Sequence, residues 1–465
     1  MTLPEIAGVV GGTVHDDVGV TVSAPAFRDS RAVEPGGLFV AVPGERVDGH
    51  DFAAAAVSQG AAAVLASHPV GVPAVVVDDT VAALGRLAAH VLNTLPARVV
   101  ALTGSQGKTG TKDLLAAVLA RHGLTVATEG SLNNELGLPL TVLRADADTD
   151  FLVLEMGARG IGHLRYLCRI AAPDVAVVLN VGKAHIGEFG SQAAIAQAKG
   201  ELVEALTAEG TAVLNADDPL VRAMAERTAA RLVRFGEDPA AEVRMEGLHG
   251  DELGRPVFDL VAGAERRTVR MRLLGEHNAA NAAAAAAAAL TLGMDLDDVA
   301  DGLSEAGSAS PWRMELHERP DGVTVINDAY NANPDSMRAA LKLLASVGRN
   351  RGPSTRTVAV LGEMLELGAE SQTEHDALGR LAVRLDIGQL LVVGEGARPI
   401  HLGASLEGSW GGESVFVPDQ DAALAWLREQ VGPGDVVLFK ASRAAALERL
   451  ATALLDDVPA EENQA

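Results

Sequence analysis

Four apolar segments in the middle of the chain constrain its fold more than any other feature. They are VVALTG (99–104), FLVLEMG (151–157), DVAVVLNVG (174–182) and GTAVLNADD (210–218), and each is followed by a helical pattern. Continuous apolar strands that alternate with helices are typical of a parallel sheet covered on both faces. We therefore predict an α/β fold built on a central parallel sheet with helices on both of its faces.

The regions on either side repeat this α/β rhythm. Short strands and helices alternate over residues 1–95, and the last third contains TVAVLGEM, QLLVVGEG and DVVLFKAS. At about 150 residues per domain, a chain of 465 residues suits three domains. We place them at residues 1–95, 96–309 and 310–465. Within the second, residues 241–274 alternate like β-hairpins and predict an insertion.

Composition excludes several classes of protein. With 48% hydrophobic and 22% charged residues, the chain can bury a sizeable core. The balance of 38 basic against 62 acidic residues, a net charge of −24, argues against nucleic acid or an anionic membrane as partner. A single cysteine excludes disulfide scaffolds. The N-terminus has no basic start, and the most apolar run is too short to span a bilayer, so we expect a cytoplasmic protein without membrane insertion.

The strongest local motif is a glycine-rich turn between a strand and a helix, in TGSQGKTGT. Backbone N–H groups and a helix N-terminus there favour a polyphosphate, with Lys108 on the outer phosphates and the Thr109 hydroxyl on Mg²⁺. Leu102 stands where the usual pattern has its first glycine. The alternative is an ordinary turn with an incidental lysine. The predicted phosphate loop comprises Gly104, Ser105, Gln106, Gly107, Lys108, Thr109 and Gly110.

Three further side chains fall at or near the carboxyl ends of the predicted central strands. Glu155 ends FLVLE, His185 follows the next strand in KAHIGEFG, and Lys199 lies in the helix AIAQAKGELVEAL. Taken singly, each has an ordinary structural interpretation: Glu155 as a capping or surface glutamate, His185 as a structural histidine and Lys199 as a surface lysine. Ligands gather at this edge of a parallel sheet, so together with the phosphate loop they favour a metal and nucleotide site.

Polar groups also mark the passage into the last domain. Asn278 and Asn281 begin a helix, where they suit either a purine edge or, for Asn278, an N-cap. Arg313 follows a small-residue joint and suits either a phosphate clamp or an interdomain salt bridge. The segment INDAYNANPDSM predicts at minimum a turn and functionally a binding loop. It contributes Asp328, Tyr330, Asn331 and Asn333.

The order of these motifs resembles that of the Mur ligases of peptidoglycan synthesis. The segments are TGSQGKTGT, LEMG, GKAHIGEFG, AKGE, GEHNAANAAAA, WRME and NDAYNANP, and the resemblance covers roughly residues 20–450. The segment from DSRAVEPGG to GAAAVL is similar to the uridine-nucleotide domain shared by the third and fourth ligases of that series. SLNNELGLPLTVL and DAYNANP favour the fourth ligase, and the DNPR segment of ligases that add a diamino acid is absent.

The resemblance implies a UDP-muramoyl-peptide-binding domain, an ATP-binding P-loop domain and a Rossmann-like C-terminal domain that receives D-alanyl-D-alanine. The implied activity is ATP-dependent ligation of that dipeptide to UDP-N-acetylmuramoyl-tripeptide through an acyl phosphate, by a monomer. The alternatives are a ligase of the same family that adds the third amino acid, a folate- or cyanophycin-type ligase, and a P-loop switch ATPase. A nucleotide-sensing scaffold without turnover is a further class.

The resemblance also implies roles residue by residue. Lys108 would bind the phosphates of ATP, and Thr109 with Glu155 would hold one Mg²⁺. A second Mg²⁺ would bind Glu155, His185 and a carbamate on Lys199, which turns a cation into an oxygen ligand. The other implied contacts are Asn278 and Asn281 for adenine, Arg313 for the γ-phosphate, Asp328 for the nucleotide side, Ser30 and Arg31 for the uridine diphosphate, and Asn133, Asn134, Tyr330, Asn331 and Asn333 for the substrates. Trp312 departs from the family's frequent glycine.

Overall fold

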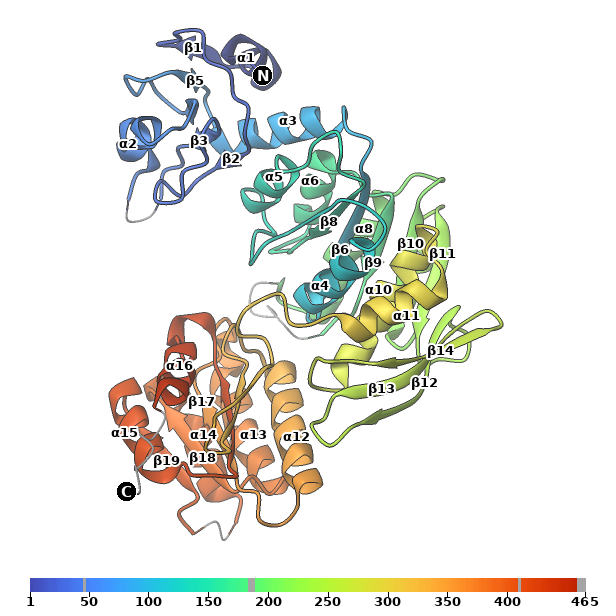
Figure 1. Cartoon of the computed structure of the whole chain (residues 1–465), viewed down its shortest axis with the longest axis vertical. Helices are drawn as coiled ribbons and strands as arrows, with labels where there is room; N and C mark the ends of the chain where they lie inside the picture. Colours follow the sequence, from blue (N-terminus) through green and yellow to red (C-terminus); the bar gives the residue numbers. More distant parts are fainter. Residues whose placement is uncertain (45–46, 183–188, 409–410, 458–465) are drawn as a thin grey trace, which may run out of the picture.

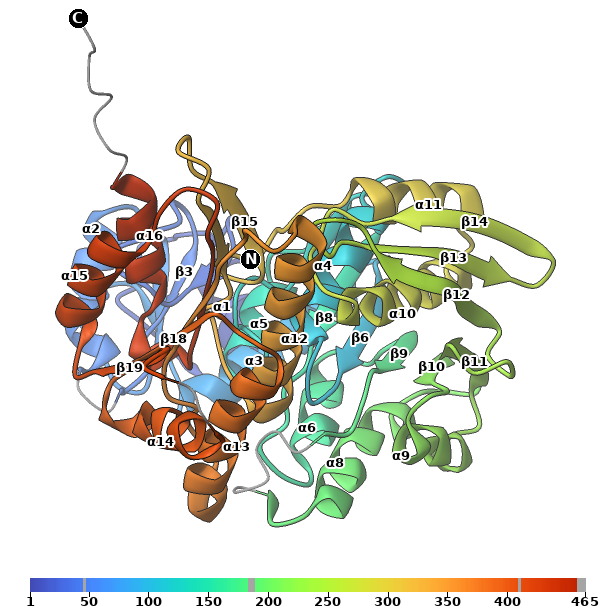
Figure 2. The same ribbon diagram turned by 90° about the horizontal axis from the view of Figure 1, so that it is seen from below.

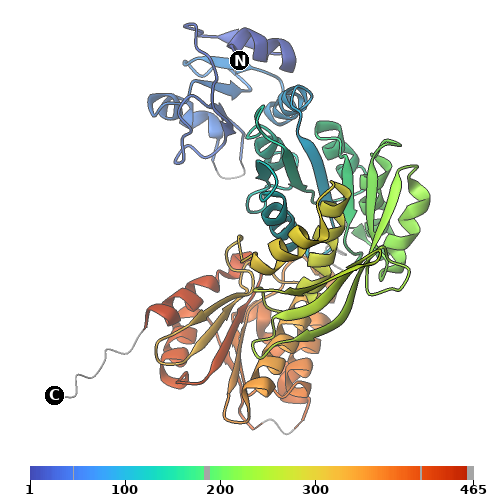
Figure 3. The same ribbon diagram turned by 45° about the vertical axis from the view of Figure 1, so that its right-hand side comes forward.

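Three α/β domains lie in a row in the computed structural model, which describes residues 1–44, 47–182, 189–408 and 411–457. The N-terminal domain and the C-terminal domain occupy opposite ends, and the central domain joins them (Figure 1). Figure 3 shows the same order from a second direction. The predicted α/β class and three-domain architecture are confirmed.

The first domain contains a five-stranded sheet in the order β1–β5–β4–β3–β2. Its strands are β1 (Thr13–His15), β2 (Ala26–Phe27), β3 (Leu38–Val40), β4 (Ala63–Ala66) and β5 (Ala74–Val76), and its helices are α1 (Leu3–Val10), α2 (Ala53–Ser58) and α3 (Thr80–Leu92). Only β1 runs antiparallel to its neighbour. The Asp79 carboxylate caps α3 by accepting from the N–H groups of Val81 and Ala82. This helix leads into the central domain (Figure 1).

The central domain contains a nine-stranded sheet in the order β14–β13–β12–β11–β10–β9–β6–β8–β7. Its strands are β6 (Arg98–Thr103), β7 (Thr125–Ala127), β8 (Phe151–Glu155), β9 (Val175–Val178), β10 (Thr211–Asn215), β11 (Arg231–Gly236), β12 (Val243–Gly250), β13 (Pro256–Ala262) and β14 (Glu265–Arg270). Pairing is parallel from β7 to β12 and antiparallel from β12 to β14. The predicted hairpins therefore exist, and they extend the edge of the central sheet.

Helices cover both faces of this sheet, as predicted. They are α4 (Lys108–Leu119), α5 (Gly137–Val142), α6 (His163–Ile170), α8 (Gln192–Glu204), α9 (Pro219–Arg222), α10 (His277–Thr291) and α11 (Leu296–Glu305). Val100 and Leu102 of β6 join the core under α4, α10 and α11. Val99 and Ala101 join the core on the opposite face, under α5, α6 and α8. Because successive side chains of β6 point to opposite faces of the sheet, they pack into two separate hydrophobic cores.

The alanine run of α10 gives this helix a very small cross-section. All of residues 282–289 are alanine and fully buried, and α10 packs along α4. Because alanine side chains are short, the two backbones can approach closely. The two helices lie side by side (Figure 2), and Asn278 and Asn281 near the start of α10 approach Gly107 and Gly110 at the start of α4.

The C-terminal domain contains a six-stranded sheet in the order β15–β16–β20–β17–β18–β19, in which only β15 is antiparallel. Its strands are β15 (Glu315–Glu318), β16 (Thr324–Asn327), β17 (Thr357–Leu361), β18 (Gln389–Val393), β19 (Ser414–Val417) and β20 (Val436–Lys440). Its helices are α12 (Pro334–Arg351), α13 (Ser371–Arg384), α14 (Arg398–Leu406), α15 (Gln420–Gln430) and α16 (Glu448–Asp456). In the part of the chain that the structure describes, no helix has the length and apolarity needed to cross a membrane.

Gly379 tests how closely two helices of this domain pack. A Cβ there would collide with the backbone carbonyl of Ile400, because α13 and α14 touch through Gly379 and Gly403. We expect Gly379→Ala to lower the free energy of unfolding by about 2 kcal/mol or more, despite the helix preference of alanine. Urea unfolding followed by tryptophan fluorescence reports on this domain, because all three tryptophans lie at positions 312, 410 and 426.

Gly432→Ala is the matched control in the same domain. Its Cβ would meet open space, so we expect a change within about 0.5 kcal/mol. Equal effects of the two substitutions would contradict the packing argument.

Candidate active site

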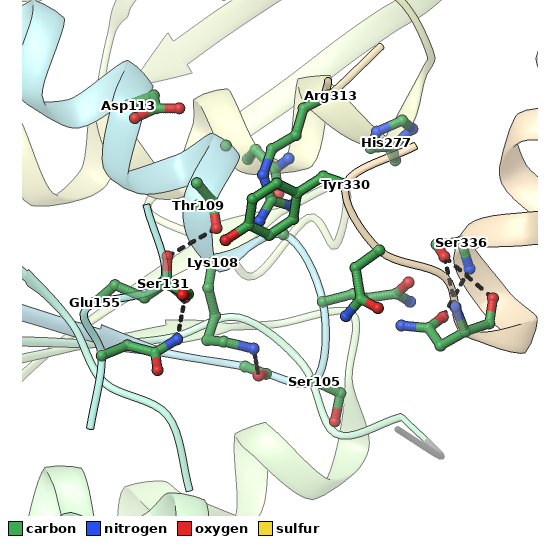
Figure 4. A pocket seen from close by; sticks show the side chains of 18 of the residues that line it. Ser105, Lys108, Thr109, Asp113, Ser131, Glu155, His277, Arg313, Tyr330 and Ser336 are labelled. Atoms are coloured by element: carbon green, nitrogen blue, oxygen red, sulfur yellow. Dashed lines mark hydrogen bonds between the residues drawn. The ribbon is translucent and has the colours of Figure 1, made fainter. Parts of the chain in front are cut away.

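One cavity of about 600 Å³ lies where the carboxyl ends of the central strands meet the C-terminal domain (Figure 4). Most of the predicted site residues line it together. They are Gly104, Ser105, Gln106, Gly107, Lys108, Thr109, Gly110, Asn133, Asn134, Glu155, Lys199, Asn278, Asn281, Arg313, Asp328, Tyr330, Asn331 and Asn333. A cavity of this size suits a nucleotide together with part of a second substrate.

Three predicted residues stand apart from this cavity. Ser30 and Arg31 lie in the first domain, where the exposed Arg31 pairs with Asp29 at 2.7 Å between Nη2 and Oδ2. His185 lies outside the described residues. The cavity therefore gathers the residues predicted for ATP and the dipeptide, but not those predicted for the uridine nucleotide.

The phosphate loop has the predicted strand, turn and helix. β6 ends at Thr103, Gly107 adopts a left-handed φ of 80°, and α4 begins at Lys108. The Lys108 ammonium lies over the loop and donates to the Gly104 carbonyl at 2.9 Å. Asn180, just beyond β9, accepts from the N–H groups of Ser105 and Gln106, each at 3.0 Å. Sequence analysis missed Asn180, although its place after an apolar strand was a usable signal.

The Glu155 carboxylate is buried and held at both oxygens. Oε2 accepts from the Thr109 hydroxyl at 2.8 Å, and Oε1 accepts from the Asn133 amide at 2.8 Å. β8, α4 and the loop before α5 thus fix one carboxylate beside the phosphate loop. Oxygen ligands of this kind suit Mg²⁺. Asn133, which was predicted to contact substrate, lines the cavity and also orients Glu155.

Two lysines, Lys108 and Lys199, line the cavity. Burial lowers the pKa of Lys199 well below that of a free lysine, and the charge of Lys108 lowers it further. Burial also lowers the pKa of Lys108, while the nearby Glu155 opposes that shift and Arg313 adds to it. On its own, the cavity therefore disfavours the charged form of both lysines, and a bound anionic phosphate would favour it.

Arg313 enters the cavity from the joint between the domains. Its guanidinium lies 4.0 Å from the ring centre of Tyr330, and its buried Nε has no hydrogen-bond partner among the described residues. Trp312 and Met314 on either side have left-handed φ values of 59° and 51°. The family's frequent glycine suits such a backbone better than Trp312 does, and the Arg443 guanidinium packs on the Trp312 ring at 4.4 Å.

Asp328 holds the same joint from the C-terminal sheet. Its carboxylate pairs with the buried Lys440 ammonium at 2.5 Å and accepts from the Met314 N–H at 3.2 Å. Lys440 also donates to the Asn331 carbonyl at 3.0 Å. Asp328 thus lines the cavity, and its two interactions tie the ends of β16 and β20 to the residue after Arg313.

The predicted asparagines all line the cavity, and some of them also hold the starts of helices. Asn333 caps α12, and Asn134 accepts from the Gly137 N–H at the start of α5. Asn278 does not cap α10, so that alternative is wrong: it lies inside the helix and donates to the Leu274 carbonyl at 2.8 Å. Asn281 donates to Asn278 at 2.9 Å and packs on Gly107, where a Cβ would collide with its amide.

Comparisons with known proteins agree along the whole chain. Residues 28–91 match the Mur ligase family catalytic domain, residues 102–289 the Mur ligase middle domain, and residues 312–443 the Mur ligase glutamate ligase domain. A Mycobacterium bovis protein named UDP-N-acetylmuramoyl-tripeptide--D-alanyl-D-alanine ligase is 50% identical, over 98% of each chain. The chain belongs to the Mur ligase family. Its fold was therefore correctly anticipated from the order of its motifs.

Solved structures support the same assignment. A UDP-N-acetylmuramoylalanyl-D-glutamyl-2,6-diaminopimelate--D-alanyl-D-alanyl ligase from Acinetobacter baumannii superposes with a TM-score of 0.84 at 32% identity, over 98% of both chains. The Thermotoga maritima MurF ligase in complex with ADP gives a TM-score of 0.80 at 31% identity, over 94% of this chain and 98% of that one. This Mur ligase thus matches relatives along their full length, including one that binds ADP.

The loop after β17 in this Mur ligase is positioned by a buried histidine. His375 Nε2 accepts from the Met364 N–H at 2.8 Å, and Nδ1 donates to the Ser371 carbonyl at 2.7 Å. Only neutral imidazole can make both interactions. Burial accordingly lowers the pKa of His375, although the Ser371 carbonyl opposes the shift. This loop carries Glu366 to the cavity.

His375 should make stability depend on pH. Its folded pKa lies below the unfolded value of about 6.5, so the unfolded chain takes up the proton first as pH falls. We expect the free energy of unfolding to fall below about pH 6.5, and His375→Gln to reduce that fall. The measurement is tryptophan-monitored urea unfolding at pH 7.5 and 5.5. The control is His317→Gln, at a half-exposed site on β15, which should lose as much unfolding free energy between pH 7.5 and 5.5 as wild type does. An equal loss in wild type and both variants would refute the assignment of the pH dependence to His375.

Proposed function

We propose that this chain joins D-alanyl-D-alanine to UDP-N-acetylmuramoyl-tripeptide, using ATP and releasing ADP and phosphate. The observation that carries the proposal is the single cavity in which Lys108, Glu155 and Lys199 of the central domain face Arg313 and Tyr330 of the joint and the C-terminal domain. The names of relatives with 50% identity and full-length coverage support the choice of substrates. In this proposal residues 1–95 bind the uridine nucleotide, residues 96–309 bind ATP and residues 310–465 receive the dipeptide.

The first chemical step brings two anions together. The terminal carboxylate of the tripeptide attacks the γ-phosphorus of ATP, which forms an acyl phosphate and releases ADP. Lys108 and Arg313 offset the repulsion and stabilise the charge of the phosphoryl-transfer transition state. Arg313 suits this role because its Nε is buried without a partner among the described residues, so an incoming phosphate oxygen can accept from it.

The second step forms the peptide bond. The amine of D-alanyl-D-alanine attacks the acyl carbon, loses a proton, and phosphate leaves from the tetrahedral intermediate. Residues of the DAYNANP loop line the cavity from the C-terminal domain, and we assign them to the dipeptide. Because acyl phosphates hydrolyse in water, closure of the C-terminal domain over the cavity has a clear purpose.

Mg²⁺ fits the donors present at this site. Thr109 and Glu155 supply a hydroxyl and a carboxylate for one ion, and Glu155, His185 and a carbamate on Lys199 would supply a second. Bound Mg²⁺ would neutralise charge on the phosphate oxygens. The lowered pKa of Lys199 supports the carbamate, because only a neutral amine reacts with carbon dioxide. We also propose a monomer, as the family resemblance implies, and a cytoplasmic location, which the single cysteine fits and where ATP is available.

Phosphate release tests the reaction directly. With ATP and UDP-N-acetylmuramoyl-tripeptide, we expect release to depend on D-alanyl-D-alanine and the nucleotide product to gain the mass of one dipeptide residue unit. Release without any acceptor would favour a P-loop switch ATPase. Turnover only with a free diamino acid and the shorter muramoyl-dipeptide nucleotide would favour the ligase that adds the third residue.

Asn133 tests the metal site. Asn133→Ala removes the hydrogen bond that orients Glu155, so we expect the Mg²⁺ concentration for half-maximal phosphate release to rise by about 10- to 100-fold. Asn134→Ala is the matched control. It removes the acceptor of the Gly137 N–H at a cost of about 1 kcal/mol in stability and should leave the Mg²⁺ requirement as it was. Identical Mg²⁺ curves for Asn133→Ala and wild type would count against Glu155 as a ligand.

A further inference from the structure

A shallow surface depression of about 510 Å³, here called the side cavity, lies beside the catalytic cavity. Its walls are Asp79 with the first turn of α3, and Glu135, Arg159, His163 and Tyr166 of the central domain. Arg159 and His163 also line the catalytic cavity. The side cavity therefore adjoins the reaction site at the seam between the first and central domains, where α3 packs on α5 and α6.

The backbone beneath Arg159 is held in place by side chains. His163 Nδ1 accepts from the Arg159 N–H at 3.2 Å, and Nε2 then donates to Glu135 at 3.1 Å. The buried Glu201 carboxylate of α8 accepts from the Gly162 N–H at 2.6 Å and the Arg165 N–H at 3.1 Å. Two elements thus fix this loop, and α8 also carries Lys199.

The Arg159 guanidinium, in contrast, is loosely engaged. Its side chain is 68% exposed, and its nearest carboxylate among the described residues is Glu135, with Nη1 and Oε1 3.8 Å apart. That distance exceeds a hydrogen bond, and exposed pairs of this kind contribute little. The planar guanidinium keeps donors that can bind a carboxylate in a bidentate manner. Arg159 therefore combines an ordered backbone with a guanidinium that is only weakly paired with Glu135, so its donors can reach a ligand.

The acyl donor must pass this seam. Under the proposed function, its uridine nucleotide binds the first domain while its terminal carboxylate reaches Lys108 and Arg313. The donor in the name of the Acinetobacter baumannii relative carries alanyl-D-glutamyl-2,6-diaminopimelate. Such a peptide has two carboxylates besides the one that is activated, one on the D-glutamyl residue and one on diaminopimelate. Both flank the reacting carboxylate, as the side cavity flanks the catalytic cavity.

We propose that the side cavity binds one of these flanking carboxylates of the acyl donor through Arg159, with Glu135 and His163 as positioning residues. The inference rests on the proposed function and deepens it. It makes Arg159 a specificity-determining residue that recognises the peptide rather than the nucleotide. Lysine at the third position lacks the second of these carboxylates, and D-isoglutamine at the second position lacks the first.

The test compares wild type with Arg159→Ala on three donors: the diaminopimelate tripeptide, its lysine counterpart, and the diaminopimelate tripeptide with D-isoglutamine. We expect Arg159→Ala to raise the KM of the first donor about tenfold or more. The KM of D-alanyl-D-alanine should stay within twofold. Arg159→Lys should recover part of the loss, because it restores the charge without the bidentate fork. Arg169→Ala, at an exposed position on α6 outside both cavities, should match wild type.

The donor series identifies the carboxylate. If the lysine donor already binds weakly to wild type and Arg159→Ala adds nothing, Arg159 binds the diaminopimelate carboxylate. The same result with the D-isoglutamine donor assigns the D-glutamyl carboxylate. The inference is overturned if Arg159→Ala leaves every donor KM within twofold, or raises all three equally. Wild type that ligates D-alanyl-D-alanine to none of the donors would instead refute the proposed function.

Discussion

Two cationic side chains, Lys108 and Arg313, meet beside the buried Lys199 in one cavity of a chain whose net charge is −24. The net negative charge of the chain repels phosphates and carboxylates, so the attraction for an anionic nucleotide and an anionic donor must come from local cations at this site. Burial lowers the pKa of both lysines, and charge repulsion lowers it further, from Arg313 on Lys108 and from Lys108 on Lys199. Bound phosphate relieves that repulsion, which makes the cluster selective for the charge distribution of phosphoryl transfer.

Small residues allow these charges to be placed so closely. The alanine helix α10 lies directly on α4, and Gly107 accommodates the Asn281 amide where any side chain would collide. Asn180 and Glu155 then fasten the loop to neighbouring strand ends. The geometry of the site therefore follows from close backbone packing together with a few buried hydrogen bonds. The C-terminal domain adds Arg313 through a joint held by the Asp328–Lys440 pair.

The sequence predicted the features that depend on local pattern. Apolar strands, the glycine turn before Lys108 and Glu155 at a strand end follow from neighbours in the chain, and all of them lie where expected. Contacts between distant segments were not predictable in this way. Asn180 on the phosphate loop and Lys440 on Asp328 join residues 74 or more positions apart. Asn278 shows what a local pattern can miss. Its sequence context suits an N-cap, but α10 already begins at His277, one residue before it.

The central claim is that the donor carboxylate attacks the γ-phosphorus of ATP within this cavity. The direct test uses UDP-N-acetylmuramoyl-tripeptide whose terminal carboxylate carries ¹⁸O at both oxygens. After ligation of D-alanyl-D-alanine, mass spectrometry of the released phosphate and of the nucleotide product follows the label. An acyl phosphate predicts one ¹⁸O in phosphate and one in the new amide. Phosphate free of label would contradict the account, because its oxygen would then have come from water.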